Sequence, residues 1–315
     1  MLRIVRVLAP NPGPFTLEGT NTWIVGSSRA VVIDPGPEEA EHLQAVTEEA
    51  DSFSAILLTH DHPDHARGAV RLSEMVRAPI RSFREGSGRE RLVDGERIRV
   101  EGSVLRTLHA PGHTADHVVF MAEEDGALFT GDCVLGRGTS VIDPPEGDLA
   151  SYLRSLQQML SLDPRVIYPG HGPTVFDAQA RLREYLTHRA TREDQVLRAL
   201  QDGPATPADL VPGIYADTPS ELHPVAERQI LAHLLKLERE GRVVRTGMGR
   251  RERFAMAGER ACERCGRPVA PGQRLCRRCS LDALQETPRP EATATAEPEP
   301  EPEPGPGPEP GGAGG

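Results

Sequence analysis

The sequence has no long hydrophobic run and few cysteines. No apolar stretch approaches the roughly 20 residues that a membrane-spanning helix requires, and residues 1–8 are too short and too charged for the core of a signal peptide. These absences predict a cytoplasmic protein without a membrane segment. Four of the five cysteines lie in two Cys-x-x-Cys pairs near the C-terminus, a pattern that favours metal binding over disulfides.

Charge is unevenly distributed along the 315 residues. The formal net charge is −11, but residues 1–187 carry −9 and residues 188–282 carry +4, and the acidic remainder lies in 283–315. A polyanion would therefore meet the middle segment more readily than the rest of the chain. The length predicts more than one domain.

The densest cluster of polar side chains follows the apolar run 54–58, which has the length and character of a strand. The turn 59–65, Thr-His-Asp-His-Pro-Asp-His, places three imidazoles and two carboxylates within six residues, and residues 66–77 after it have helical spacing. Neutral imidazole and carboxylate are the usual ligands of a catalytic zinc. The turn therefore predicts a metal site, and because its side chains can diverge, one turn can serve two metals.

Three further strand ends carry candidate ligands. They are His113 in the segment 109–114, Asp132 in 131–133, and His171 after Gly170. In each, glycine or proline lets the backbone turn sharply beside a polar side chain. A single histidine after glycine is usually a loop residue, but four such strand ends in one chain indicate a shared centre. Strands and helices alternate over 1–187, which is compatible with two mixed sheets or one large α/β layer.

These motifs resemble the metallo-β-lactamase superfamily over residues 1–187. The resemblance rests on the pattern His-x-His-x-Asp-His at 60–65 together with the three later strand ends. It implies an αββα sandwich with two zinc ions at one edge of the two sheets. It also implies that His60, His62 and His113 hold one zinc. Asp64, His65 and His171 would hold the other, and Asp132 would bridge the two.

A closer resemblance extends to about residue 256. Segments 11–26, 131–136, 168–173 and 185–189 are similar to the lactamase-β-like-2 subfamily, in which a helical domain follows. That subfamily includes a mitochondrial endoribonuclease selective for single strands, whereas its bacterial relatives are mostly named only as metallo-hydrolases. The resemblance therefore implies a hydrolase and leaves its substrate open.

The chemistry expected of this centre is hydrolysis. Two zinc ions about 3.5–4 Å apart can share a water and lower its pKa, giving a bridging hydroxide without a side-chain base. We expect Asp64 also to orient this nucleophile by accepting its hydrogen bond. His117 is a catalytic candidate, either as a proton donor to the leaving group or as a support for a metal ligand, and support is the commoner role. Cys133 is expected to be a buried neutral thiol, and His109 a strand-end residue.

Residues 188–256 predict three helices followed by a hairpin, the order of a winged helix. The hairpin carries five arginines against a single acid: Arg242, Arg245, Arg250, Arg251 and Arg253. These suit phosphate contacts with single-stranded RNA. They equally suit a solvated face on a domain that only packs against the hydrolase.

The last segments predict a small metal module and a tail. The pairs Cys262-x-x-Cys265 and Cys276-x-x-Cys279 predict a zinc ribbon over 260–281, in which four thiolates hold one structural Zn²⁺ that the segment needs to fold. Alternating Glu-Pro and then Gly-Pro over 283–315 cannot bury a core and predicts a disordered acidic tail.

We therefore expect a dinuclear zinc-dependent hydrolase. The leading hypothesis for its substrate is single-stranded RNA, brought to the site by the winged helix and the basic ribbon and cut there. The alternative is a small thioester, lactone or related ester, as in glyoxalase II. A nucleic-acid-binding regulator with a dead centre is a third interpretation, against which the complete ligand set argues.

Overall fold

The computed structural model describes residues 2–84, 86, 88–246, 252–258, 260–261, 264–265, 268–269 and 279. The described residues form two compact units, 1–259 and 260–315, which are considered separately.

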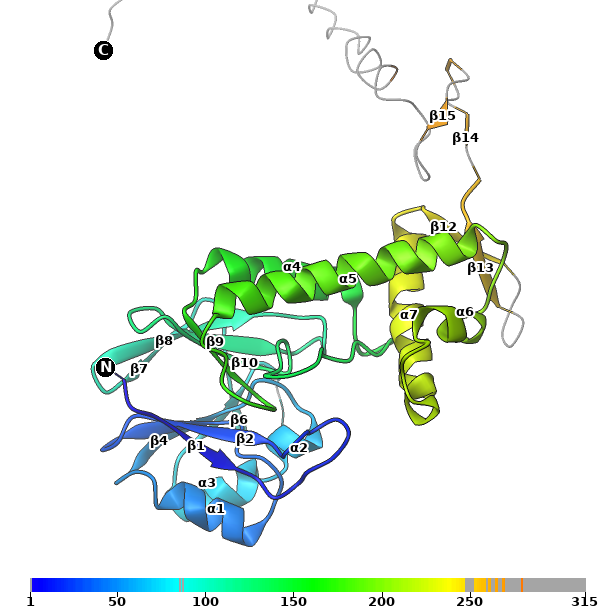
Figure 1. Ribbon diagram of the computed structural model, residues 1–315. Helices are drawn as coiled ribbons and strands as arrows, with labels where there is room; N and C mark the ends of the chain where they lie inside the picture. Colours follow the sequence, from blue (N-terminus) through cyan, green and yellow to red (C-terminus); the bar gives the residue numbers. More distant parts are fainter. Residues whose placement is uncertain are drawn as a thin grey trace, which may run out of the picture. The chain divides into compact units, whose positions relative to one another are not determined.

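Two β-sheets form the centre of the first unit (Figure 1). The first has the order β1-β2-β3-β4-β5-β6, with bounds Ile4–Leu8, Asn21–Val25, Ala30–Ile33, Phe53–Leu57, Ile80–Ser82 and Arg89–Arg91. β1, β2 and β3 pair antiparallel, and β3 to β6 pair parallel. The second sheet has the order β11-β10-β9-β8-β7, with bounds Val166–Pro169, Ala127–Gly131, Val118–Ala122, Ser103–His109 and Arg97–Val100. There β10 and β11 are parallel and the other pairs antiparallel.

Helices cover the outer face of each sheet. The helices α1 (Ala40–Thr47) and α3 (Ala69–Val76) pack on the first sheet through a cluster that includes Leu43 and Leu72. The helices α4 (Leu149–Ser161) and α5 (Ala178–Leu200) pack on the second through Tyr152 and Tyr185. Between the sheets lies a third cluster that includes Phe120. This four-layer arrangement confirms the predicted αββα sandwich.

Local sequence explains where these elements begin. Asp148 caps α4 by accepting a hydrogen bond from the Ser151 backbone N–H at 2.8 Å. The strands β2 and β3 are buried along their whole length, as expected for β-branched runs between two covered faces.

The sequence did not predict β5 and β6, which lie in a polar segment. The helix expected over 66–77 is present as α3, which begins three residues later, and a further short helix, α2 (Pro63–Ala66), starts at Pro63 within the polar turn.

The winged helix is confirmed in 1–259 and shares α5 with the sandwich (Figure 1). The C-terminal half of α5, α6 (Pro207–Ile214) and α7 (His223–Arg239) enclose a separate apolar cluster that includes Leu234 and Phe254. A 3-10 helix, η1 (Ser220–Leu222), precedes α7, and the strands β12 (Val243–Thr246) and β13 (Arg253–Met256) form the hairpin. The predicted boundary at 187/188 falls within α5, which runs without a break from the second sheet into this cluster.

In the second unit the structure describes one antiparallel strand pair, β14 (Arg260–Ala261) with β15 (Pro268–Val269). Cys265 is exposed and Cys279 is buried, while Cys262 and Cys276 lie outside the described residues, as does the predicted tail over 283–315. The zinc ribbon and the disordered tail therefore stay predictions. No helix in the described part of the chain combines the length and the apolar character needed to cross a membrane.

Candidate metal centre

Seven side chains from four strand ends converge in two groups. The first group is His60, His62, His113 and Asp132, and the second is Asp64, His65 and His171. Within each group the candidate ligand atoms all lie within 4.8 Å of one another. The turn after β4 supplies four of the seven, and the ends of β10 and β11 and the loop after β8 supply the rest. The structure thus brings together every ligand position predicted for the active site.

Ring nitrogens face one another at the centre of the first group. His62 Nδ1 lies 3.0 Å from His60 Nε2 and 3.1 Å from His113 Nε2. The outer nitrogen of His113 donates to the carbonyl of Val141 at 2.8 Å. Since a neutral imidazole has one donor and one acceptor, the inner nitrogen of His113 presents a lone pair.

The same reasoning applies to His60 through its neighbour Thr59. The Thr59 hydroxyl donates to Asp34 at 2.7 Å, so it accepts from His60 Nδ1 at 3.0 Å. His60 Nε2 is therefore a second inward lone pair. Lone pairs aimed at one another repel unless a proton or a cation lies between them, and such a donor set fits a divalent cation.

The second group is built in the same way. His65 Nδ1 donates to Asp34 Oδ2 at 2.9 Å, and His171 Nδ1 donates to the Gly19 carbonyl at 3.1 Å. Their Nε2 atoms then face each other at 3.1 Å. Asp64 Oδ2 completes the group at 3.2 Å from His171 Nε2. These residues also fit a cation, since every histidine of the group directs its free lone pair inward.

Asp132 lies between the two groups. Its Oδ1 is 3.4 Å from the Nε2 atoms of both His65 and His171, and its Oδ2 is 3.7 Å from His113 Nε2. Oδ1 is buried and has no hydrogen-bond partner in the structure. Burial opposes ionisation, but the positive charge that His171 and His65 carry when protonated holds the pKa of Asp132 well below its usual range. A carboxylate in this position is suited to bridge two cations.

Gly131 explains how Asp132 reaches this place. Its φ is +47°, and a Cβ there would lie 2.5 Å from Thr59 Oγ1 and 2.9 Å from His117 Nε2. Only glycine permits this close approach of β10 to the metal turn.

His117 lies behind the ligands and does not line the cavity beside them. It is completely buried and stacks on His60 with ring centroids 4.8 Å apart. Its Nε2 accepts from the backbone N–H of Asp132 at 3.2 Å, and its Nδ1 lies 3.4 Å from the sulfur of Cys133. Burial, with His113 nearby, lowers its pKa well below the usual value, so the ring is neutral. This placement suits the positioning of Asp132 and does not suit donation of a proton to a leaving group.

Asp34 is the functional residue that the sequence analysis missed. Its Oδ1 accepts from the Thr59 backbone N–H at 2.8 Å, and its Oδ2 accepts from Thr59 and His65. It adopts a φ of +52° at the end of β3, the parallel neighbour of β4. The signal in the sequence was a carboxylate directly after a buried strand, which its Pro-Gly context made indistinguishable from an ordinary turn residue.

Two residues near the centre take the non-ligand places expected of them. Cys133 is completely buried and donates to the Ala110 carbonyl, and burial raises the pKa of its thiol. His109 is the last residue of β8, and its ring stacks on Phe83 with ring centroids 4.1 Å apart. Its Nε2 donates to the Ala115 carbonyl and not to a ligand of the centre.

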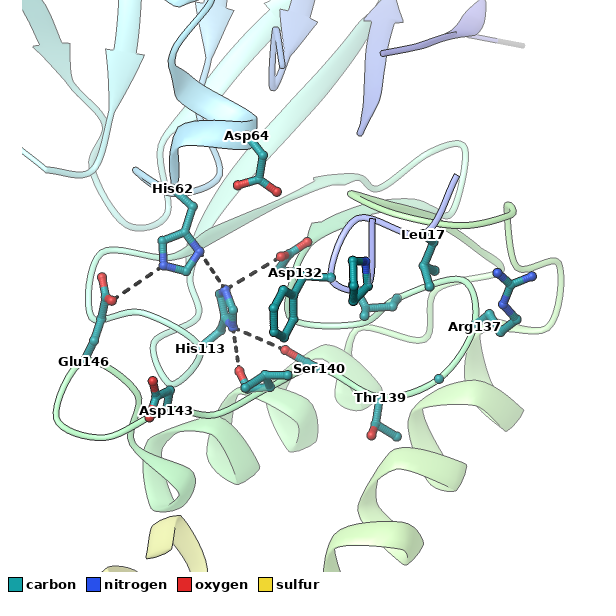
Figure 2. Close-up of a pocket in the computed structure, with 15 residues that line it drawn as sticks. Leu17, His62, Asp64, His113, Asp132, Arg137, Thr139, Ser140, Asp143 and Glu146 are labelled. Atoms are coloured by element: carbon teal, nitrogen blue, oxygen red, sulfur yellow. Dashed lines mark hydrogen bonds and ion pairs between the residues drawn. The ribbon is translucent and has the colours of Figure 1, made fainter. Parts of the chain in front are cut away.

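A cavity of about 380 Å³ opens beside the first group (Figure 2). His62, Asp64, His113 and Asp132 lie on its inner side, and Phe15, Leu17, Leu135 and Val141 provide apolar wall. The rim carries Glu146, whose Oε2 is 3.6 Å from His62 Nε2, and Asp143, which pairs with Arg228. A cavity with apolar walls and a few convergent polar groups is typical of a small-molecule site.

Comparison with known proteins points to one family. The Metallo-beta-lactamase superfamily matches residues 15–87 and 74–171, and the Beta-lactamase associated winged helix domain matches residues 206–251. A Beta-lactamase-like protein 2 homolog from Drosophila melanogaster is 36% identical over 265 residues, 76% of this chain and 89% of the relative.

Two further relatives bear on activity and on fold. An Atrochrysone carboxyl ACP thioesterase from Aspergillus chevalieri is 36% identical over 275 residues, 82% of this chain and 88% of the relative. The crystal structure of a Beta-lactamase domain protein from Burkholderia ambifaria has a TM-score of 0.71 at 24% identity, covering 81% of this chain and 91% of that one. The last likeness concerns the fold alone.

Proposed function

Because this chain belongs to the metallo-beta-lactamase superfamily of hydrolases, we propose that it is a dinuclear zinc enzyme that hydrolyses acyl thioesters. The observation that carries this proposal is the meeting of the two ligand groups at Asp132, beside a cavity with apolar walls. The thioesterase among its relatives, similar over most of both chains, supports the substrate class.

The donor set of imidazoles and carboxylates suits zinc. His60, His62 and His113 would hold one ion, Asp64, His65 and His171 the other, and Asp132 both. Two such ions would lower the pKa of a shared water and polarise the thioester carbonyl.

The remaining chemistry belongs to the protein's own side chains. Asp64 borders the cavity with its side chain 29% exposed, so it can accept a hydrogen bond from the attacking water and orient it. His117 holds the backbone of Asp132, and Asp34 holds the ring of His65. Phe15 and Leu17 can contact the acyl chain and exclude water from it.

The test compares metal-loaded protein with its His62→Ala variant on a panel of S-acyl pantetheines. We expect hydrolysis by the native protein and its loss in the variant. Release of thiol at equal rates by both proteins would show that a contaminant acts, and the absence of hydrolysis across the panel would refute the proposal.

Single-stranded RNA is the second candidate substrate, and the winged helix with its arginine-rich hairpin favours it. Three hairpin arginines, however, already face carboxylates: Arg242 pairs with Glu193, Arg245 with Glu238 and Glu252, and Arg253 with Asp209. Pairs of this kind reduce the charge available to phosphates, which is why we place RNA second. RNA offered in parallel, with the same His62→Ala control, decides between the two.

We further propose that the four C-terminal cysteines hold a structural Zn²⁺. Elemental analysis should find three zinc ions per native chain and two in the Cys265→Ser variant. Equal zinc content in the two proteins would contradict a site that includes Cys265.

A further inference from the structure

A second cavity, of about 280 Å³, adjoins the metal cavity. Pro14, Phe15 and Ser140 line both cavities, so the two lie side by side. From these shared residues the second cavity extends along α5 to residues of the winged helix. A third hollow continues past His188, Arg192 and Tyr215. We call the part lined by His188, Arg189, Arg192, Tyr215 and Gln229 the arginine groove.

The two arginines of this groove have no carboxylate partner among the described residues. Arg189 is 2% exposed and donates to Gln229 Oε1 at 2.8 Å and to the Ser140 carbonyl. Arg192 donates to the Ile214 carbonyl and to Gln195, and its guanidinium lies 4.3 Å from the Tyr215 ring centre.

Three nitrogen atoms beside the groove have no hydrogen-bond partner among the described residues. They are the Nε atoms of Arg189 and Arg192 and the Nδ1 of His188, all of them buried. Elsewhere on the same helix the arrangement differs, since Arg181 pairs with Glu184. A buried guanidinium without a counter-charge is costly, and its planar fork of donors matches a phosphate.

The surroundings of the groove are consistent with a positive field. Burial, with Arg189 and Arg192, lowers the pKa of His188 to about 4, so the positive charge of the groove comes from the two arginines alone. Asp217, which lines the outer hollow, is exposed and forms no ion pair with either arginine. Lys236 and Glu193 neutralise each other on the neighbouring helices at 2.6 Å.

We propose that the arginine groove binds a phosphate on the thiol part of the substrate while the acyl end lies at the metal centre. The inference rests on the proposed function and names its substrate more closely, as a thioester of a phosphorylated carrier such as phosphopantetheine. Because the groove adjoins the metal cavity, one extended molecule can reach both. The two guanidinium groups without a counter-charge select its anionic end.

The test uses two substrates that differ only in this phosphate, S-butyryl 4′-phosphopantetheine and S-butyryl pantetheine. The native enzyme should show a kcat/KM at least about tenfold higher for the phosphorylated form, as expected from a hydrogen bond between charged groups. In Arg192→Gln this ratio should fall towards one, and Arg192→Lys, which keeps the charge and loses the fork, should be intermediate. Arg183→Gln is the matched control, because Arg183 is exposed on the same helix, donates to Gln179 and lines neither cavity, and it should keep the native ratio.

Binding separates failure of the groove from failure of the proposed function. If neither thioester is hydrolysed, the proposed function fails, and calorimetry with 4′-phosphopantetheine and pantetheine still tests the groove. Tighter binding of 4′-phosphopantetheine than of pantetheine supports the proposal if the difference disappears in Arg192→Gln. Equal kcat/KM values for the two thioesters, or equal affinities for 4′-phosphopantetheine and pantetheine, would overturn it. An Arg192→Gln variant in which only cleavage of single-stranded RNA changes would overturn it too.

Discussion

The metal centre and the winged-helix hairpin are both rich in ionisable side chains, but they hold them in opposite ways. At the metal centre, lone pairs of His60 and His113 face His62 without a cationic partner. In the hairpin, Arg245 lies between Glu238 and Glu252 at 2.6 and 2.5 Å. The first arrangement is complete only with a ligand, whereas the second is already complete.

This difference distinguishes regions prepared for a ligand from regions that only carry charge. The arginine groove resembles the metal centre in this respect, since Arg189 and Arg192 lack counter-charges among the described residues although they lie on α5, the helix that the winged helix shares with the sandwich. A buried charge without a counter-charge is costly, and paired surface groups contribute little. Substitutions should therefore have large effects at the centre and small effects at the hairpin.

The largest effect should follow Asp132→Ala, because Asp132 contacts both ligand groups. We expect loss of bound metal and a fall in kcat/KM of more than about 100-fold, since changes one shell further out already cost about 10–100-fold. Elemental analysis and thioester hydrolysis measure the two quantities. Asp61→Asn is the control in the same turn, as Asp61 pairs with Arg89 and Arg84. An Asp132→Ala protein that retains two metals would refute the bridging position.

A smaller effect is expected from Asp34→Asn, which acts through His65 without touching a metal. Both carboxylate oxygens of Asp34 accept hydrogen bonds, Oδ1 from the Thr59 backbone and Oδ2 from the Thr59 hydroxyl and His65 Nδ1. An amide has only one acceptor oxygen, so one of these two sets of donors would face an NH2 group. Affinity for the metal at the second group should fall about 10–100-fold, while the first group keeps its metal. Metal titration monitored by calorimetry measures this. Asp51→Asn, an exposed acid, is the control, and unchanged affinity at both groups would contradict the assignment.

The contrast between Asp34 and the ligands also shows what the sequence could predict. The ligand positions follow from a local rule, polar residues directly after apolar strands, and the rule needs no knowledge of which strands are neighbours. Asp34 obeys the same rule, but its role depends on the parallel pairing of β3 with β4, which places it beside Thr59. Sheet order is a property of the whole fold, so local patterns could not reveal it.

Two other features were out of reach for the same reason. The continuous α5 hides a domain boundary because its apolar positions pack on two clusters in turn, with Leu182 in one and Leu200 in the other. The pairing of the hairpin arginines depends on where α7 brings Glu238, which the sequence separation does not specify. The run of basic residues therefore predicted phosphate contacts, whereas in the structure several of these arginines pair with neighbouring carboxylates.

A third, intermediate effect should appear in the pH dependence of stability at His233. This ring is 1% exposed, and neither nitrogen has a hydrogen-bond partner in the structure. Burial, with Arg189 and Lys236, lowers its pKa from 6.5 to about 3. The unfolded chain therefore binds the proton more readily, and stability that is fully present above pH 6.5 is lost as the pH falls towards 3.

Between pH 7 and pH 5 this one group should lower the free energy of unfolding by about 2 kcal/mol. Urea unfolding of the native protein and of His233→Leu at several pH values measures it. The difference in slope between the two proteins isolates His233 from the histidines of the metal centre. Parallel slopes would show that His233 does not titrate in this way.

The smallest effect should follow Arg245→Ala in the hairpin. Because Arg245 is partly exposed and already paired with Glu238 and Glu252, its loss should cost less than about 1 kcal/mol of stability. Binding of single-stranded RNA should keep its salt dependence, whereas removal of a true phosphate contact would reduce the slope of log affinity against log salt by about one. Fluorescence anisotropy at several salt concentrations measures that slope, with Arg192→Gln alongside. A reduced slope in Arg245→Ala alone would assign phosphate contacts to the hairpin. It would reverse the contrast, because the arginine already paired with carboxylates would then be the one that binds phosphate.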